Sequence, residues 1–146
     1  MLINLLVGIL FLVDRLTKWC ALGISEGGIF LWSEKFVGLR LYKNFNLIFN
    51  IVLPEALMYG LISLILAVLV WLLIKNYRQK NIFLIFAFSL IIAGAISNLV
   101  DRLYFGYVID FLSFFDYSIF NLSDVFIFGG VGLIFIREFF LKNKDL

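Results

Sequence analysis

The sequence predicts an all-α polytopic membrane protein with four transmembrane helices and a small extracytoplasmic β element. Of its 146 residues, 64% are hydrophobic and 15% are charged, and the mean hydropathy is +1.08. A soluble domain is closer to half apolar and one quarter charged. Because a small domain leaves much of its surface exposed, a chain of this length cannot bury so much apolar surface in its own interior. A lipid bilayer has to solvate the remainder.

The apolar residues are concentrated in four runs, each near the roughly 20 residues that a spanning helix needs. These runs cover about residues 2–22, 56–74, 82–100 and 122–141. The second and third runs contain no charged residue. No Lys or Arg precedes the first run and no small-residue cleavage site follows it, so we expect a retained helix rather than a signal peptide. With no internal repeat or linker, residues 1–146 are predicted to form a single membrane domain.

The positive charges predict how the chain is oriented in the membrane. The short connection at 75–80 carries three positive charges and no acid, and the C-terminal tail carries Lys142 and Lys144. Because cytoplasmic loops are enriched in Lys and Arg, we expect this connection and both termini to be cytoplasmic. The outer segments, at about 23–55 and 101–121, then lie on the opposite face.

The first outer segment has a pattern of its own. Residues 36–43 partly alternate apolar and polar side chains, which predicts a short strand. Asn44-Phe45-Asn46 follows as a turn signal. Pro54 lies where the second span begins, and proline is tolerated in a first helical turn. We therefore expect a small sheet on the outer surface, followed by the second helix.

Composition excludes several kinds of chemistry. The formal net charge of +2 is too small to indicate nucleic-acid binding. Cys20 is the only cysteine, so neither an intramolecular disulfide nor a multi-cysteine metal site can form. The absence of histidine removes His-based triads and HExxH zinc sites. An enzyme built on this chain would use carboxylates, Lys or Tyr for acid–base steps, and neither a metal nor a cofactor is expected.

Two aspartates near the outer helix ends are the strongest candidates for catalysis. Asp110 and Asp124 lie on either side of an aromatic outer loop that allows them to meet. Asn121 is expected at the N-cap of the fourth helix, which places Asp124 in a first turn where the helix dipole stabilises a carboxylate. Two carboxylates at close range do not both ionise easily, so one keeps a proton while the other activates water. The alternative is that Asp124 only caps its helix and Asp110 is a solvated loop acid.

Two further groups of polar residues lie at outer helix ends. Asn98, Asp101 and Arg102 share one face of the third helix through their i, i+3 and i+4 spacing. Arg102 is expected either to pair with Asp101 or to hold a substrate carbonyl or phosphate. In the first helix, the i, i+4 spacing of Asp14 and Lys18 predicts an ion pair, for which we favour a structural role.

Taken in order, five motifs resemble those of signal peptidase II, the lipoprotein signal peptidase of bacteria, a family of four-span aspartic proteases of the inner membrane. They are Asp14-Arg15-Leu16-Thr17-Lys18 (family D-x-x-T-K), Asn44-Phe45-Asn46-Leu47-Ile48-Phe49 (N-x-G-x-x-F), Gly94 to Arg102 (G-x-x-G-N-x-x-D-R), Gly106-Tyr107-Val108-Ile109-Asp110-Phe111 (G-x-V-x-D-F) and Phe120-Asn121-Leu122-Ser123-Asp124 (F-N-x-A-D). Each motif alone is weakly specific, but together they cover nearly the whole chain in the family's order. Three positions depart from the pattern: Asn46 and Ser97 stand where the family has Gly, and Ser123 where it has Ala.

The resemblance implies a specific function. The chain would be an intramembrane aspartic endopeptidase that cuts a diacylglyceryl-modified prolipoprotein just before its lipidated Cys. It would lie in the bacterial inner membrane, with the active site near the outer face. The expected partners are this substrate and membrane lipid, with no nucleic acid, and the protein is expected to be a monomer.

The resemblance also implies a set of site residues. Asp110 and Asp124 match the catalytic aspartates. The positions that line the substrate groove are Asn44, Asn98, Arg102, Val108 and Asn121, and the supporting positions are Asp14, Lys18 and Asp101.

Two other function classes stay open. A small proton-coupled carrier would need acids near the bilayer midplane and helices broken there, and the uncharged second and third runs count against it. An inactive relative that acts as a membrane binding or assembly module is kept open by Asn46 and Ser97. Asp116 matches no motif and is expected to be a solvated loop residue.

Overall fold

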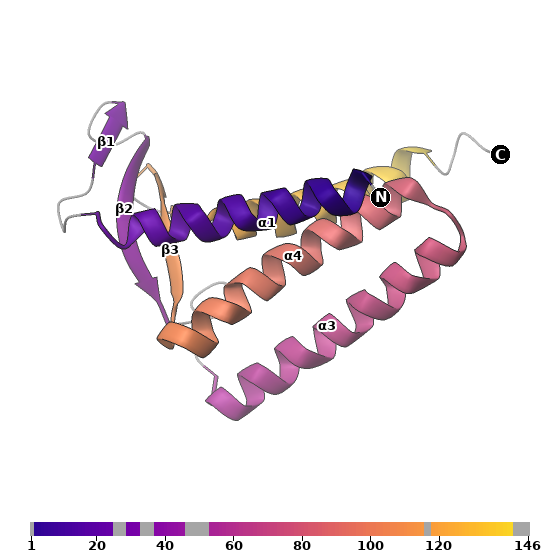
Figure 1. Ribbon diagram of the computed structural model, residues 1–146, viewed down its shortest axis with the longest axis horizontal. Coiled ribbons are helices and arrows are strands. Elements are labelled where there is room, and N and C mark those ends of the chain that lie inside the picture. Colours follow the sequence, from indigo (N-terminus) through magenta and orange to yellow (C-terminus); the bar gives the residue numbers. More distant parts are fainter. Residues whose placement is uncertain (1, 25–28, 33–36, 46–52, 116–117, 142–146) are drawn as a thin grey trace.

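The computed structural model describes residues 2–24, 29–32, 37–45, 53–115 and 118–141. Within these ranges the chain is mostly helical, with a small antiparallel sheet (Figure 1). The elements are α1 (Leu2–Ala21), β1 (Ile29–Trp32), β2 (Val37–Asn44), α3 (Glu55–Arg78), α4 (Ile82–Phe105), β3 (Val108–Phe114), β4 (Ser118–Phe120), α5 (Leu122–Ile136) and a final π-helical turn, η2 (Arg137–Leu141). The predicted combination of long helices and a small sheet is confirmed.

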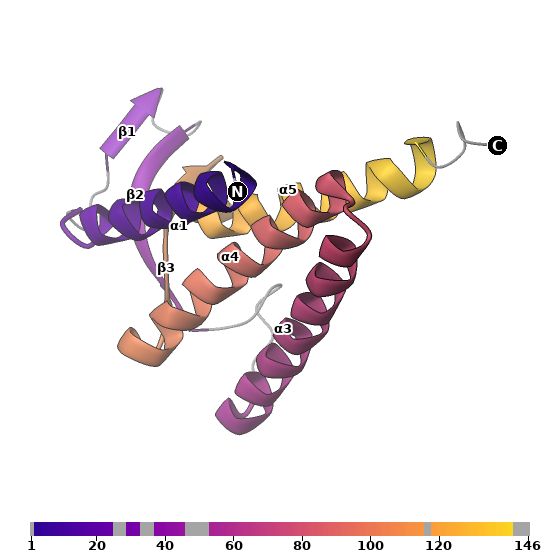
Figure 2. The same cartoon turned by 45° about the vertical axis from the view of Figure 1, so that its right-hand side comes forward.

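The helix α4 is the centre of the bundle and packs against α1, α3 and α5. Figures 1 and 2 show α3 meeting α4 near the connection at 79–81 and diverging from it toward the sheet. The helices α3 and α4 are long and apolar enough to cross a membrane. Only 6% of the most apolar window of α3 is buried, against 50% for α4. The membrane therefore has to cover α3, while α4 forms the core, and the count of four spans stays a prediction.

The helix α4 ends later than the hydropathy predicts. The apolar run stops at about residue 100, but the helix continues to Phe105 and closes at Gly106. Gly106 has a φ of 80°, a left-handed conformation that glycine adopts without a steric penalty. Asp101 and Arg102 therefore lie on the helix, and the outer segment begins at about residue 106 instead of 101. Hydropathy locates the apolar part of a helix, whereas the cap residue locates its end.

The sheet lies at one end of the helices, in the order β1-β2-β3-β4 with every neighbouring pair antiparallel (Figure 1). The predicted strand at 36–43 corresponds to β2, which pairs with β3 in a register that places Tyr42 opposite Asp110. Successive side chains of a strand point to opposite faces. On β3, Ile109 and Phe111 pack against Ala21 at the end of α1, so Asp110 points the other way. This alternation aims a carboxylate away from the apolar contact with α1.

Two glycines allow α4 and α5 to pack closely. A Cβ added to Gly94 would lie 2.4 Å from the carbonyl oxygen of Ser123, and one added to Gly130 would lie 2.5 Å from Cγ1 of Ile91. Small residues at helix contacts in membranes let backbones approach in this way. The Gly94 contact falls on the first turn of α5, which carries Asp124.

We expect Gly94→Ala to lower the free energy of unfolding by about 1–3 kcal/mol, because the added methyl group overpacks a backbone contact. Thermal unfolding of the purified protein in detergent measures this. The matched control is Gly132→Ala in the same helix pair, where a Cβ meets nothing within 4 Å. Equal melting temperatures for the two variants would show that the α4–α5 contact tolerates a methyl group.

Candidate active site

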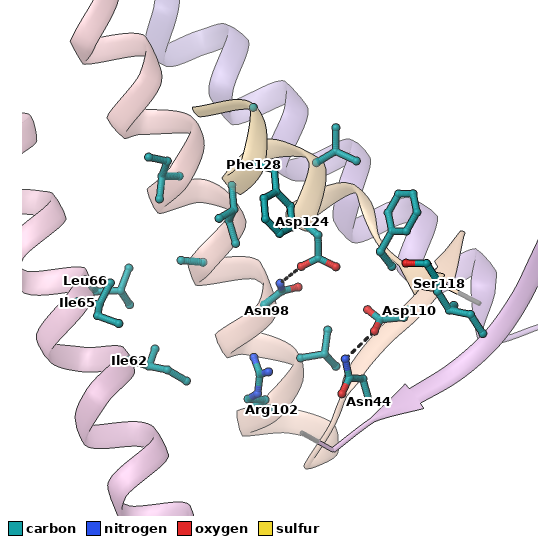
Figure 3. A pocket seen from close by; sticks show the side chains of 18 of the residues that line it. Asn44, Ile62, Ile65, Leu66, Asn98, Arg102, Asp110, Ser118, Asp124 and Phe128 are labelled. Atoms are coloured by element: carbon teal, nitrogen blue, oxygen red, sulfur yellow. Dashed lines mark hydrogen bonds between the residues drawn. The ribbon is translucent and has the colours of Figure 1, made fainter. Parts of the chain in front are cut away.

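Asp110 and Asp124 line one cavity of about 990 Å³, although they come from different elements. Figure 3 shows Asp110 projecting from β3 and Asp124 from α5 into the same space, with Arg102 of α4 nearby. The opposite wall is apolar and is formed by α3 through Ile62, Ile65 and Leu66. The fold therefore brings two carboxylates to the polar end of a largely apolar cavity.

The first turn of α5 fixes Asp124. Asn121 is the N-cap, as predicted, and its Oδ1 accepts a hydrogen bond from the backbone N–H of Asp124 at 3.0 Å. In return, the backbone N–H of Asn121 donates to Oδ2 of Asp124 at 3.2 Å. This reciprocal pair is a capping box, which satisfies two of the free donors at a helix start. The other oxygen of Asp124 accepts from Nδ2 of Asn98 at 2.9 Å.

Asp110 lies on β3, outside the helices, and its side chain is almost fully buried. Nδ2 of Asn44 donates to its Oδ2 at 2.9 Å, and Nδ2 of Asn121 donates to its Oδ1 at 2.7 Å. Burial raises the pKa of Asp110 to about 6 because it disfavours the charged form. The hydrogen bond from Asn44 lowers this pKa and the nearby charge of Asp124 raises it. An acid with a pKa near 6 exchanges its proton close to neutral pH.

Asn121 connects the two aspartates. Its side chain is fully buried, and one amide group donates to Asp110 while also donating to Oδ1 of Asn98 at 3.2 Å. Asn98 in turn donates to Asp124. The carboxylates are therefore joined through two asparagine amides that hold each of them in place.

A network of buried charges lies behind Asn98. Lys18 is fully buried, and its Nζ lies 2.7 Å from Oδ2 of Asp101 and 3.5 Å from Oδ2 of Asp14. The predicted pair of Asp14 and Lys18 is therefore present in the structure. Asp101 also pairs with Arg15. The pairing considered between Asp101 and Arg102 is not what the structure has: Asp101 bonds to the two cations of α1, and Arg102 lines the cavity.

Three residues of this network escaped the sequence analysis. They are Arg15, Ser97 and Ser123. Both serine hydroxyls donate to Oδ2 of Asp14, and the backbone N–H of Ser123 donates to its Oδ1 at 2.8 Å. The signal for Arg15 was its position at the end of an apolar run, where a charge needs a partner. The serines were noted in the sequence only as departures from the family pattern, and their contacts with Asp14 depend on how three helices cross.

Four of the five residues expected in the substrate groove line the cavity: Asn44, Asn98, Arg102 and Val108. The fifth, Asn121, does not line the cavity and is fully buried, with a hydrogen bond to Asp110. Tyr42, Ser118 and Phe128 also line the cavity and were not anticipated. Asn46 and Asp116 lie outside the described residues.

We expect Asn44→Leu to shift the pH dependence of kcat/KM to higher pH. The amide of Asn44 donates to the carboxylate and so favours its ionised form; removing that donor raises the pKa of Asp110 further above its value of about 6. The inflection that belongs to Asp110 in the free enzyme moves with it. Initial rates across a pH series measure the shift. Asn4→Leu, near the far end of α1, is the control and leaves the inflection in place; a shift to lower pH in Asn44→Leu would contradict the assignment.

Comparison with known proteins places the chain in a family. The model of the family described as signal peptidase (SPase) II matches residues 6–140. The lipoprotein signal peptidase of Helicobacter pylori (strain P12) is 32% identical over 146 aligned residues, which cover 95% of this chain and 89% of that protein. The lipoprotein signal peptidase of Brucella ovis is 41% identical over 86 residues, covering 55% of this chain and 54% of that one.

Solved structures agree. One, titled as a bacterial membrane enzyme at 2.3 Å resolution, superposes with a TM-score of 0.84 at 28% identity, over 97% of this chain and 88% of that chain. A second, with the same title at 1.9 Å, gives a TM-score of 0.82 at 29% identity, over 94% and 92% of the two chains. The protein is therefore a membrane protease that belongs to the signal peptidase II family.

Proposed function

We propose that this protein is an aspartic endopeptidase that removes the signal peptide from diacylglyceryl-modified prolipoproteins, cutting just before the lipidated Cys. The observation that carries the proposal is the pair of buried carboxylates, Asp110 and Asp124, joined through two asparagine amides at one end of an apolar cavity. Membership of the signal peptidase II family and the names of the relatives support the choice of substrate.

In the proposed reaction the two aspartates hold one water and share one proton. The ionised aspartate takes a proton from the water while the oxygen of that water attacks the scissile carbonyl. The protonated aspartate donates a hydrogen bond to the developing oxyanion. Collapse of the tetrahedral intermediate breaks the C–N bond, and the leaving amine takes up a proton from the dyad. The raised pKa of Asp110, about 6, supports proton sharing, because it brings the protonation of this carboxyl closer to neutral pH than that of an ordinary aspartate.

The cavity suits a substrate that is part peptide and part lipid. Its wall of Ile62, Ile65 and Leu66 offers apolar contact to acyl chains, and Asn44 and Arg102 offer donors for peptide or ester carbonyls. Asn121 is fully buried, so we assign it to positioning the aspartates and not to contact with substrate. Asp14, Lys18 and Asp101 support the site from behind.

The proposed setting is a bacterial inner membrane crossed by four helices in a single-domain monomer. Both termini face the cytoplasm, and the sheet and the aspartates lie near the outer face. The lysine and arginine residues of the connection at 75–80 support this orientation. The continuous backbone of α3 and α4 counts against a carrier, which would need broken helices around its site.

The test is cleavage of a synthetic precursor by the purified protein in detergent. A precursor whose lipobox Cys carries diacylglycerol is expected to release its signal peptide, with the cut directly before that Cys, as mass spectrometry of both products reports. The same precursor without the lipid is the matched control and is expected to react far more slowly. If the folded protein fails to cleave the lipidated precursor, the result favours the alternative that the protein is an inactive relative acting as a membrane binding or assembly module.

A further inference from the structure

Lys18 is a buried cation whose Nζ makes two hydrogen bonds besides its ion pairs, and the longer of them goes to Oγ of Ser123 at 3.4 Å. Its side chain is fully buried and does not line the cavity, yet Nζ donates to Oδ1 of Asn98 at 2.7 Å. Asn98 is the residue whose Nδ2 donates to Asp124. A single side chain thus separates the charge network of α1 from a proposed catalytic carboxylate.

The chemistry of an ammonium group settles which way the Asn98 amide faces. Lysine carries three N–H donors and no acceptor, so the end of the amide that faces Nζ has to be the oxygen. The NH₂ end is then turned to Asp124. Nδ2 of Asn121 donates to the same oxygen at 3.2 Å and favours the same orientation.

The amide orientation of Asn121 is also fixed by a group that can only donate, but here the donor is a neighbour in the sequence. The backbone N–H of Asp124 is a donor only and faces Oδ1 of Asn121, which turns the NH₂ group of Asn121 to Asp110. That lock is built into the first turn of α5. The orientation of Asn98 is instead held by two side chains from other elements: Lys18 of α1, whose Nζ is the nearer donor at 2.7 Å, and Asn121 at 3.2 Å.

We propose that Lys18 is a positioning residue, which fixes the amide of Asn98 with its NH₂ group toward Asp124. The inference rests on the proposed role of Asp110 and Asp124. Rotating the amide of Asn98 by half a turn would place its oxygen against the carboxylate of Asp124, removing a donor and adding a repulsive contact. Lys18 therefore acts on Asp124 through Asn98, in addition to neutralising Asp14 and Asp101.

A single substitution of Lys18 would remove both its charge compensation of Asp14 and Asp101 and its contact with Asn98, so their effects could not be separated. Lys18→Met leaves Asp14 and Asp101 buried with less positive charge, and an unpaired buried charge is strongly destabilising. Asp101 retains Arg15. The companion change Asp14→Asn removes the other excess charge, and an amide there can still accept from the N–H of Ser123, whose hydroxyl is free to rotate. Lys18→Met/Asp14→Asn therefore removes the nearer of the two donors to Oδ1 of Asn98 while keeping the charges balanced.

The expected result is a split between stability and turnover. Lys18→Met/Asp14→Asn recovers the melting temperature that Lys18→Met loses, but its kcat stays roughly 10- to 100-fold below that of the unmodified protein, because a small misplacement of a reacting group is costly. KM for the lipidated precursor changes less than kcat, since Lys18 itself does not line the cavity and acts only through Asn98, which does. A second double variant, Lys18→Gln/Asp14→Asn, carries the same charge but keeps an N–H donor, and it regains part of kcat. Lys75→Met, on the exposed part of α3, is the matched control and keeps normal kinetics.

Asn98→Leu completes the test as a double-mutant cycle. If Lys18 acts through Asn98, adding Asn98→Leu to Lys18→Met/Asp14→Asn lowers kcat no further, because both changes remove one interaction. The inference is overturned if the losses multiply, or if the Met and Gln double variants both return to normal kcat. Failure of the proposed function is a different result: Asp124→Asn would then cleave the precursor at a normal rate.

Discussion

Replacing Asp124 by Asn is expected to lower kcat for the lipidated precursor by roughly 100- to 10,000-fold, the usual cost of losing a general acid–base group. An amide cannot take a proton from the attacking water. The fold should survive, because the amide oxygen can still accept from the backbone N–H of Asn121 and the capping box is a local contact. Initial rates of precursor cleavage, normalised to folded protein, measure the loss.

Asp110→Asn is the partner experiment and should fall in the same range. Both oxygens of Asp110 accept from amide groups, those of Asn44 and Asn121, so the variant also places one NH₂ group against another. Asp124→Asn keeps the bond from the backbone N–H of Asn121 but likewise turns its NH₂ group toward Nδ2 of Asn98, so both variants are compared per folded protein. Glu138→Gln in η2 is the matched control, since its carboxylate is partly exposed and far along the chain from the site. Normal processing of the precursor by either aspartate variant would contradict a catalytic role for the Asp110/Asp124 pair.

The two aspartates could be singled out as candidates from the sequence because carboxylates beside long apolar runs are conspicuous, and the structure has both in the lining of one cavity. The capping position of Asn121 was predictable too, since its spacing to Asp124 is a local pattern. Asp110 itself lies on the strand β3. Features that depend on residues close together in the sequence, such as the N-cap at Asn121, were therefore predicted correctly.

The partners of Asp14 and Asp101 were not predictable in the same way. Arg15 reaches Asp101 from another helix, and both serine hydroxyls converge on one oxygen of Asp14 from α4 and α5. These contacts depend on the crossing of three helices, which the close approach at Gly94 makes possible. Ser97 and Ser123 depart from the family pattern, and the structure places both in this buried network instead of the cavity wall.

Asp101→Ala is expected to lower the free energy of unfolding by about 3–5 kcal/mol, because removing one member of a buried ion pair leaves the rest uncompensated. Asp101 is fully buried between Arg15 and Lys18, with Nζ of Lys18 at 2.7 Å. Its Oδ2 also accepts from the backbone N–H of Ile109 at 3.3 Å, which ties α4 to the strand that carries Asp110. Thermal or denaturant unfolding in detergent measures the change.

The control for Asp101→Ala is Glu138→Ala, which removes an acid of the partly exposed pair with Arg137 at 3.5 Å. Exposed pairs contribute only about 0–1 kcal/mol, so this variant should unfold almost as the unmodified protein does. The comparison holds the chemical change constant and varies burial. Similar stability of the two variants would mean that water or a rearranged side chain compensates the cations of α1. Because Lys18 retains Asp14 after the change, its hold on Asn98 should persist, and the folded fraction of Asp101→Ala should keep most of its turnover.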